Sequence, residues 1–183
     1  MKPRVLCLIT NGFEEIETVT PVDLLRRLGA EVTIVALHPP KQVIGRSGIR
    51  MEADAVLEEI DPEEFEVLLL PGGPGYKEMR EDGRPAQLAR RFAEQGKWIA
   101  AICAAPAILW DAGILQGRSF TAHAAVREEL RGAVEAEVVE DGKILTSRGP
   151  GTALRFALVL GEKLFGAEAV LQLRKDIMLD PAD

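Results

Sequence analysis

Cys103 is the residue of the chain best placed to act as a reactive group, because it stands between an apolar run at residues 98–102 and a small-residue segment that begins at Ala104. A short apolar run is typical of a strand buried on both faces, and Pro106 fits the first turn of a helix. A sharp turn from strand to helix would raise the Cys103 side chain above the sheet, where helix N–H groups favour a thiolate. A buried structural thiol is the alternative interpretation. These residues alone leave both open.

The elements that must position Cys103 are predicted from hydrophobic runs separated by turn residues. Buried strands are expected, with helices between them, at residues 4–10, 31–37, 65–70 and 98–102. We also expect a short strand at residues 118–121, a helix distorted at Pro21, and a hairpin turning at Asp141 and Gly142. Strands that alternate with helices predict an α/β sheet covered on both faces.

Four unusual segments follow predicted strands: residues 11–15, residues 71–75, Cys103, and residues 147–151. In open sheets of this kind, ligands bind at the carboxyl ends of the strands, near a topological switch point. The four segments are therefore expected to converge on one site. Cys7 lies within the first predicted strand, and we interpret it as a core residue.

Composition limits the class of protein. The 183 residues suffice for a single domain over residues 1–183, and we find no linker or repeat. A net charge of −7 without a basic stripe argues against nucleic acid or an anionic membrane as the primary partner. Two cysteines and two histidines do not indicate a disulfide framework or a metal site. The absence of a signal or membrane-spanning pattern favours a reducing cytoplasm.

Five segments together resemble the ThiJ/PfpI superfamily, and specifically its parkinsonism-associated deglycase (DJ-one) branch: residues 11–23, 70–73, 100–106, 121–123 and 145–152. They occur in the family's order at similar spacings and span most of the chain. The resemblance implies a flavodoxin-like three-layer sandwich with a mostly parallel sheet. It also implies that Cys103 occupies a nucleophile elbow and that the protein is a homodimer.

The resemblance assigns Glu15 as the acidic partner of Cys103 and His123 as the active-site histidine. A carboxyl group held against a thiolate in a poorly hydrated pocket resists ionisation and can donate a hydrogen bond to sulfur. Glu14 and Glu17 are interpreted as solvated residues at the start of a helix. Without the resemblance, Glu15 could equally be solvated, and His123 could be structural or exposed.

Main-chain groups are expected to bind the substrate oxygen. Gly72 and Gly73 allow backbone N–H groups to approach it closely, and we predict Gly73 and Ala104 as the donors to an oxyanion. The alternative for the two glycines is a tight turn after a strand. Arg148 is expected either to add positive potential near the pocket or to brace a loop or dimer contact.

Two departures from related families narrow the chemistry. Ala104 follows Cys103, where the protease-like branch has a histidine, and the sequence contains no His-x-Glu. Peptidase or glutaminase chemistry therefore lacks its base. The cysteines that eukaryotic members carry in the region of Gly45 and Glu52 are absent, so a redox role would rest on Cys103.

The candidate residues and the resemblance suggest three functions. The first is cofactor-independent glyoxalase or deglycase chemistry on methylglyoxal-type α-oxoaldehydes or their early adducts, which yields a 2-hydroxy acid. The second is an oxidative-stress sensor or redox-dependent chaperone that uses the same cysteine. The third is thiazole monophosphate biosynthesis, an older label of the family. It predicts a phosphate cradle, and the sequence has neither a P-loop nor G-x-G-x-x-G.

Overall fold

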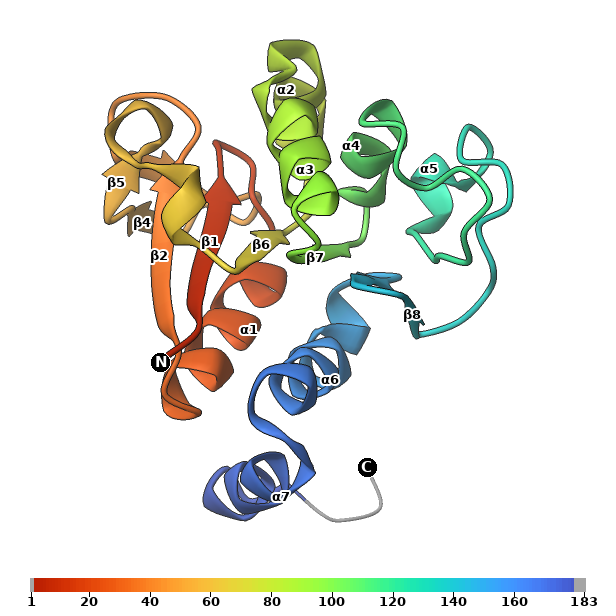
Figure 1. Cartoon of the computed structure of the whole chain (residues 1–183). Helices are drawn as coiled ribbons and strands as arrows, with labels where there is room; N and C mark the ends of the chain where they lie inside the picture. Colours follow the sequence, from red (N-terminus) through yellow and green to blue (C-terminus); the bar gives the residue numbers. More distant parts are fainter. Residues whose placement is uncertain (1, 180–183) are drawn as a thin grey trace.

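A seven-stranded sheet forms the middle layer of the molecule (Figure 1). The structure is a computed structural model and describes residues 2–179. The strand order is β5-β2-β1-β6-β7-β9-β8, and every neighbouring pair is parallel except β8 and β9. The seven strands are β1 (Arg4–Ile9), β2 (Glu31–Ala36), β5 (Ala55–Val56), β6 (Val67–Leu70), β7 (Trp98–Ile102), β8 (Val138–Asp141) and β9 (Ile144–Ser147). A separate antiparallel hairpin pairs β3 (Gln42–Ile44) with β4 (Arg50–Glu52).

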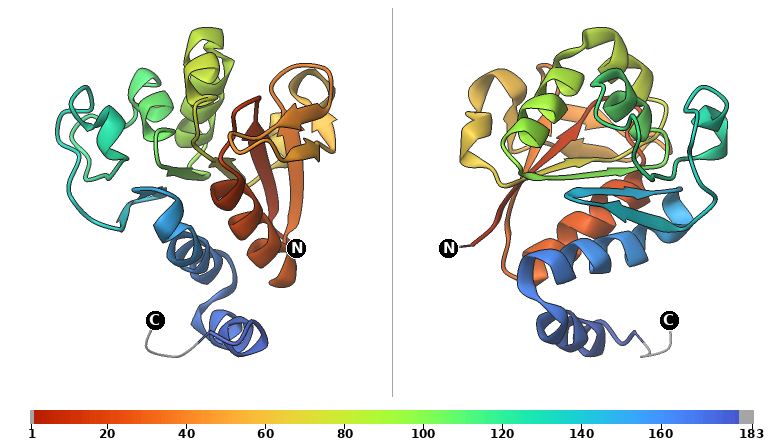
Figure 2. Two further views of the ribbon diagram at one scale, coloured as in Figure 1. Left: turned by 180° about the vertical axis from the view of Figure 1, so that it is seen from behind. Right: turned by 45° about the vertical axis from the view of Figure 1, so that its right-hand side comes forward.

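Helices cover both faces of this sheet, as Figures 1 and 2 show. One face carries α1 (Glu15–Arg27) and α6 (Ala153–Phe165), with α7 (Ala167–Asp176) packed on α6. The other face carries α2 (Tyr76–Asp82), α3 (Arg84–Glu94) and α4 (Pro106–Asp111). The remaining helical segments are short: η1 (Leu57–Glu59), η2 (Pro62–Glu64), α5 (Ala124–Arg127) and η3 (Pro150–Thr152). Within residues 2–179, no helix is long and apolar enough to cross a membrane.

The central strands are apolar along their whole length because both faces are covered. All four residues of β6 are fully buried, and so are the last four of β7. Continuous apolar runs of this kind are what a parallel sheet between two helical layers requires. The predicted flavodoxin-like α/β class is confirmed. Cys7 of β1 is fully buried as predicted, and burial raises the pKa of its thiol to about 12.

One predicted strand is absent, because a side chain takes the hydrogen bond that a neighbouring strand would have made. The strand expected at residues 118–121 is wrong, because the backbone makes only an isolated bridge between Phe120 and Ala133. The Thr121 N–H donates instead to the hydroxyl oxygen of Thr146 at 3.0 Å. Helix α2 directly follows the glycine-rich turn and was not predicted from the sequence. Pro21 lies inside α1, which runs through it from Glu15 to Arg27.

The four segments predicted to converge do meet at the carboxyl edge of the sheet. The Glu14 N–H donates to the Gly72 carbonyl at 3.0 Å, which joins the start of α1 to the turn after β6. The Cys103 N–H donates to the Ser147 carbonyl at 2.8 Å, which joins the end of β7 to the end of β9. Because the chain runs from β1 outward to β2 and then returns to β6 on the other side, the site lies at the topological switch.

Candidate active site

Cys103 occupies a strained turn directly after β7. Its φ of 67° lies in the left-handed region, which a residue with a side chain rarely adopts. Two main-chain hydrogen bonds hold it there: its N–H donates to Ser147, and its carbonyl accepts from the His123 N–H at 2.7 Å. The geometry confirms the predicted nucleophile elbow. Cys103 is buried, with 9% of the residue exposed.

Two N–H groups point at the sulfur. The backbone amides of Gly73 and Ala104 both hydrogen-bond the Cys103 side chain, and both lower the pKa of its thiol. These are the two residues that the sequence analysis names as oxyanion donors. A negative charge on sulfur, or on an oxygen attached to the carbon that sulfur attacks, would therefore face preorganised donors.

The acid beside the sulfur is Glu17, and the prediction that Glu15 lies there is wrong. Glu17 is fully buried, its Oε2 accepts the Gly72 N–H at 2.8 Å, and its carboxyl group hydrogen-bonds the Cys103 thiol. Its Oε1 is buried and makes no hydrogen bond to another described nitrogen or oxygen. Glu17 is thus the opposite of the solvated helix-start residue that the sequence analysis expected.

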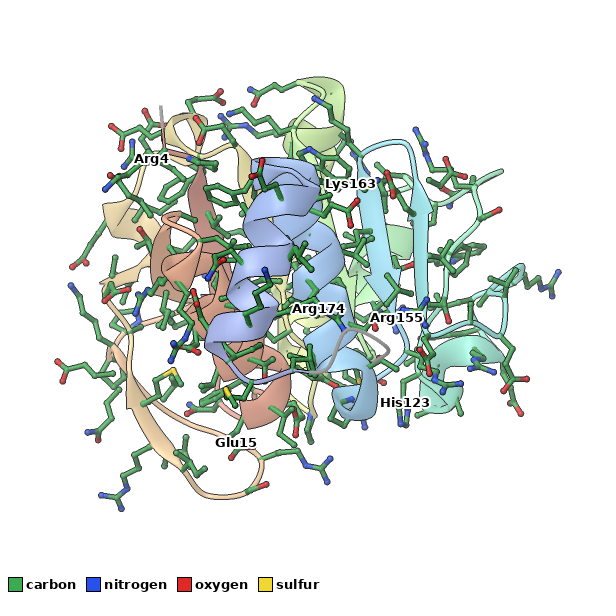
Figure 3. The ribbon with its side chains drawn as sticks, turned by 90° about the horizontal axis from the view of Figure 1, so that it is seen from below. Arg4, Glu15, His123, Arg155, Lys163 and Arg174 are labelled. Atoms are coloured by element: carbon green, nitrogen blue, oxygen red, sulfur yellow. The ribbon has the colours of Figure 1, made fainter. Side chains whose placement is uncertain are left out.

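Glu15 points away from the sulfur, toward the hairpin loop at residues 45–49. Its Oε1 accepts the Ser47 N–H at 2.8 Å, and a Cβ added to Gly45 would lie 2.3 Å from that oxygen. Positions two apart on a helix point about 200° apart, so only one of the two glutamates can face Cys103. Figure 3 shows Glu15 well apart from His123.

A signal for Glu17 was present in the sequence. The buried residues of α1 include Pro21, Leu24 and Leu25, which lie four, seven and eight positions after Glu17. This spacing is that of one helix face. Extending that apolar face back by one turn would have placed Glu17 inward.

The two carboxyl groups are shifted in opposite directions. Burial raises the pKa of Glu17 to about 7, with a further contribution from the nearby charge of Glu14. Burial also opposes ionisation of Glu15, but N–H groups of Glu15, Ser47 and Ile49 outweigh it and lower the pKa of that carboxyl group. Glu17 is therefore the group that holds a proton near neutral pH.

The thiol of Cys103 is coupled to Glu17. Burial raises the pKa of the thiol to about 12, and the charge and hydrogen bond of ionised Glu17 add to the increase. The expectation of a lowered thiol pKa is wrong for the state in which Glu17 is charged. Two of the three raising causes come from Glu17, so both disappear when Glu17 is protonated. The pair accommodates one negative charge and resists a second.

Only glycine fits at position 72. A Cβ there would lie 2.7 Å from the Cys103 Cβ and 2.8 Å from the Glu17 Oε2. Gly73, with a φ of 90°, would place a Cβ 2.4 Å from the Gly12 carbonyl oxygen. The turn after β6 is thus glycine because the sulfur, the acid and the first turn of α1 all approach its backbone.

His123 reaches the site through its backbone. It caps α5, where its Nδ1 accepts the Ala125 N–H at 3.1 Å, so the neutral ring carries its proton on Nε2. Its exposed side chain lies beside Gly149, where an added Cβ would be 3.5 Å from the ring. Arg148 lies on the same side, with a guanidinium nitrogen 3.5 Å from Glu137. The residues described contain no group of three or more His, Cys, Asp or Glu that could hold a metal ion.

The fold and site define a class of α/β protein that carries a cysteine on a strained turn beside a buried acid. The model of the DJ-1/PfpI family matches residues 3–163, and the chain belongs to that family, as the sequence resemblance indicated.

Relatives and solved structures agree with this assignment. Protein DJ-1 homolog B of Arabidopsis thaliana is 36% identical over 97% of this chain, although the chain spans only 42% of that protein. Deglycase PfpI of Pyrococcus furiosus is 36% identical over 81% of this chain and 91% of its own length. The crystal structure of Drosophila melanogaster DJ-1beta superposes with a TM-score of 0.93, at 34% identity, over 98% of this chain and all of its own.

The opposite pKa shifts predict opposite effects of pH on stability. A Glu17 pKa raised from 4.5 to about 7 means that the folded state binds the proton more tightly than the unfolded state. The parent therefore loses stability as pH rises from about 4.5 to about 7. Over that window, Glu17→Gln should gain roughly 2–3 kcal/mol relative to the parent, as measured by urea unfolding.

Glu15→Gln is the matched control. The pKa of Glu15 is lowered, so its stabilising contribution is present above the unfolded value of 4.5 and disappears as pH falls through the folded value. Glu15→Gln should thus be less stable than the parent at pH 7 and approach it in acid. Parallel pH profiles for the two variants would contradict the assignment of the acids.

Proposed function

We propose that the chain is a cysteine-dependent, cofactor-independent enzyme of the deglycase type, acting on methylglyoxal-type α-oxoaldehydes or their early adducts. The observation that carries this proposal is the contact of Cys103 with Glu17 between two backbone N–H donors. The deglycase name of the Pyrococcus furiosus relative supports the same class. The low exposure of Cys103 favours a small carbonyl compound.

The first step forms a bond between the Cys103 sulfur and the aldehyde carbon. The thiol proton passes to Glu17, which leaves a thiolate that the carboxyl group hydrogen-bonds. The aldehyde oxygen becomes an oxyanion that the N–H groups of Gly73 and Ala104 stabilise. Glu17 returns its proton to that oxygen, which gives a hemithioacetal and leaves Glu17 ionised.

The next steps move a proton between the two substrate carbons. Ionised Glu17 takes the proton from the hemithioacetal carbon while the ketone oxygen is protonated, which gives an enediol. Glu17 then returns the proton to the neighbouring carbon, and the hydroxyl group on the carbon attached to sulfur loses its proton to become a carbonyl. The carbon attached to sulfur is thereby oxidised to a thioester while its neighbour is reduced. Water then cleaves the thioester, which releases a 2-hydroxy acid and returns the thiol. His123 assists with its Nε2 proton. Atoms balance as one aldehyde plus one water.

The turnover prediction separates the two glutamates. Cys103→Ser should abolish lactate production from methylglyoxal, because no thioester can form. Glu17→Gln should lower kcat by about 10²- to 10⁴-fold while covalent capture of the aldehyde persists. Glu15→Gln, compared at equal folded fraction, should retain most of the parent's activity. Parent-like turnover by Cys103→Ser would sink the mechanism.

The same surroundings favour a second function, sensing of oxidants. Peroxide oxidises a thiolate first to a sulfenic acid and then to a sulfinic acid, and is reduced to water in each step. The N–H groups of Gly73 and Ala104 and a protonated Glu17 would hydrogen-bond the sulfinate oxygens. Cys7, by contrast, is completely buried.

This difference predicts selective oxidation. After mild peroxide treatment, mass spectrometry should find two added oxygens on the peptide that contains Cys103 and none on that containing Cys7. In Glu17→Gln, a smaller share of Cys103 should be recovered as the sulfinic acid, because the amide cannot donate the hydrogen bond that a protonated carboxyl group donates to the sulfinate. Equal modification of both cysteines, or of neither, would argue against a sensor.

The homodimer expected from the family is also proposed for this chain. The hydrogen bond from the Ser47 N–H to Glu15 links the β3–β4 hairpin to α1. Both of these elements carry exposed apolar side chains. These side chains are Ile16 (53%), Val19 (48%), Ile44 (45%) and Ile49 (57%). Neighbouring apolar side chains of this kind are typical of protein interfaces, and a second copy would cover them through a two-fold contact.

Light scattering after size exclusion tests the dimer. Ile16→Asp should shift the protein toward monomer, because a charge would be buried without a partner in the contact. Leu171→Asp, at an exposed leucine of α7 (48%), should leave the mass unchanged. A parent that is monomeric, or an effect of both variants alike, would contradict this interface.

A further inference from the structure

A groove of about 320 Å³ lies next to the candidate site, and of its charged or titratable lining residues the mechanism above uses His123 alone. Its lining includes His123, Arg127, Glu137, Arg148 and the loop at residues 149–152. Two guanidinium groups and one carboxylate line this groove, in a chain whose net charge is −7. The local charge therefore indicates what the groove binds.

The groove is tied to the nucleophile by the main chain. His123 donates its N–H to the Cys103 carbonyl, and Ser147, which precedes Arg148, accepts the Cys103 N–H. Both walls of the groove therefore lie one hydrogen bond from the backbone of Cys103. The groove thus lies at the same edge of the sheet as Cys103.

The charged groups already arrange themselves around one carboxylate. Glu137 accepts a hydrogen bond from Arg155 at 2.6 Å and lies 3.5 Å from a guanidinium nitrogen of Arg148. The Arg148 contact is the longer one, and its side chain is 42% exposed, so this guanidinium can turn to a ligand at small cost.

Arg127 adds a second donor from α5. Its Nε donates to the Ala122 carbonyl at 3.0 Å, which fixes the side chain along the groove. Its ion pair with Glu135 is long, at 3.6 Å, and Glu135 is 79% exposed. The groove lining itself holds Arg127, Arg148 and Glu137, which leaves an excess of one positive charge.

We propose that this groove binds a carboxylate carried by the substrate, so that the enzyme prefers α-oxoaldehydes with a carboxylate group over methylglyoxal. This rests on the proposed function only for the identity of the reactive carbonyl. Guanidinium groups bind carboxylates with charge-assisted hydrogen bonds, as Arg155 does to Glu137, and Arg148 lies 3.5 Å from the same carboxylate. The Nε2–H of His123 supplies one more donor.

Alkylation of Cys103 by two reagents of similar size tests the groove without any turnover. Iodoacetate is an anion and iodoacetamide is neutral, and the ratio of their rates reports the potential that a carboxylate experiences at the site. Arg148→Gln and Arg127→Gln should each lower this ratio about twofold to fivefold. Glu137→Gln should raise it by a similar factor, and added salt should reduce all the differences.

Arg91→Gln is the matched control, since Arg91 pairs with Glu63, outside the groove lining. It changes the net charge equally and should leave the ratio unchanged. An unchanged ratio in Arg148→Gln and Glu137→Gln, or an equal shift in Arg91→Gln, would overturn the proposal. Rates with iodoacetamide alone verify that the thiol itself is intact in each variant.

Two further measurements identify the chemical class of the ligand and distinguish a failure of this proposal from a failure of the proposed function. Acetate should protect Cys103 from iodoacetate at lower concentration than orthophosphate does, and the reverse order would overturn the carboxylate assignment. The kcat/KM for a carboxylate-bearing α-oxoaldehyde, relative to methylglyoxal, should fall in Arg148→Gln. If neither aldehyde is turned over while the alkylation ratio still shifts, the proposed function fails and the groove stands.

Discussion

A buried carboxyl group and a buried thiol share one hydrogen bond in this protein, and the rest of the site depends on that contact. Neither group can ionise cheaply without water, and the charge of one opposes the charge of the other. The pair of Glu17 and Cys103 therefore holds one negative charge near neutral pH, with a single proton between two acceptors. Two backbone N–H groups at the sulfur favour placing that charge where a carbonyl carbon could be attacked.

Local structure is organised to keep the two groups together. The turn after β6 is bound to the first turn of α1 in both directions: the Gly72 N–H donates to Glu17, and the Gly72 carbonyl accepts from Glu14. Glu14 in turn caps the helix by accepting the Glu17 N–H at 2.8 Å. Glu17 is thus positioned by the backbone that follows β6, and Cys103 follows β7. These two strands are parallel neighbours in the sheet.

The architecture was readable from the sequence because the central strands are buried on both faces and leave long apolar runs. The elbow was also readable, since few residue types suit a strand that turns sharply into a helix. The identity of the acid was not, because Glu15 and Glu17 differ only in which side of one helix they face, and Glu15 has its own buried partner in a distant loop. Likewise, the strand expected at residues 118–121 failed because Thr121 pairs with a side chain that only the folded sheet brings near.

The rate of Cys103 alkylation as a function of pH, in the parent and in Glu17→Gln, tests the shared proton most directly. Because the pair titrates as one unit, a thiolate that protonated Glu17 hydrogen-bonds gives the parent a midpoint below the unperturbed thiol value of 9.0, whereas a thiol beside ionised Glu17 gives a midpoint near 12. The amide of Glu17→Gln is a weaker donor, so its midpoint should be higher and its rate at neutral pH lower. A variant that reacts faster than the parent at neutral pH would show that the carboxylate, and not the sulfur, carries the charge, and would contradict the account.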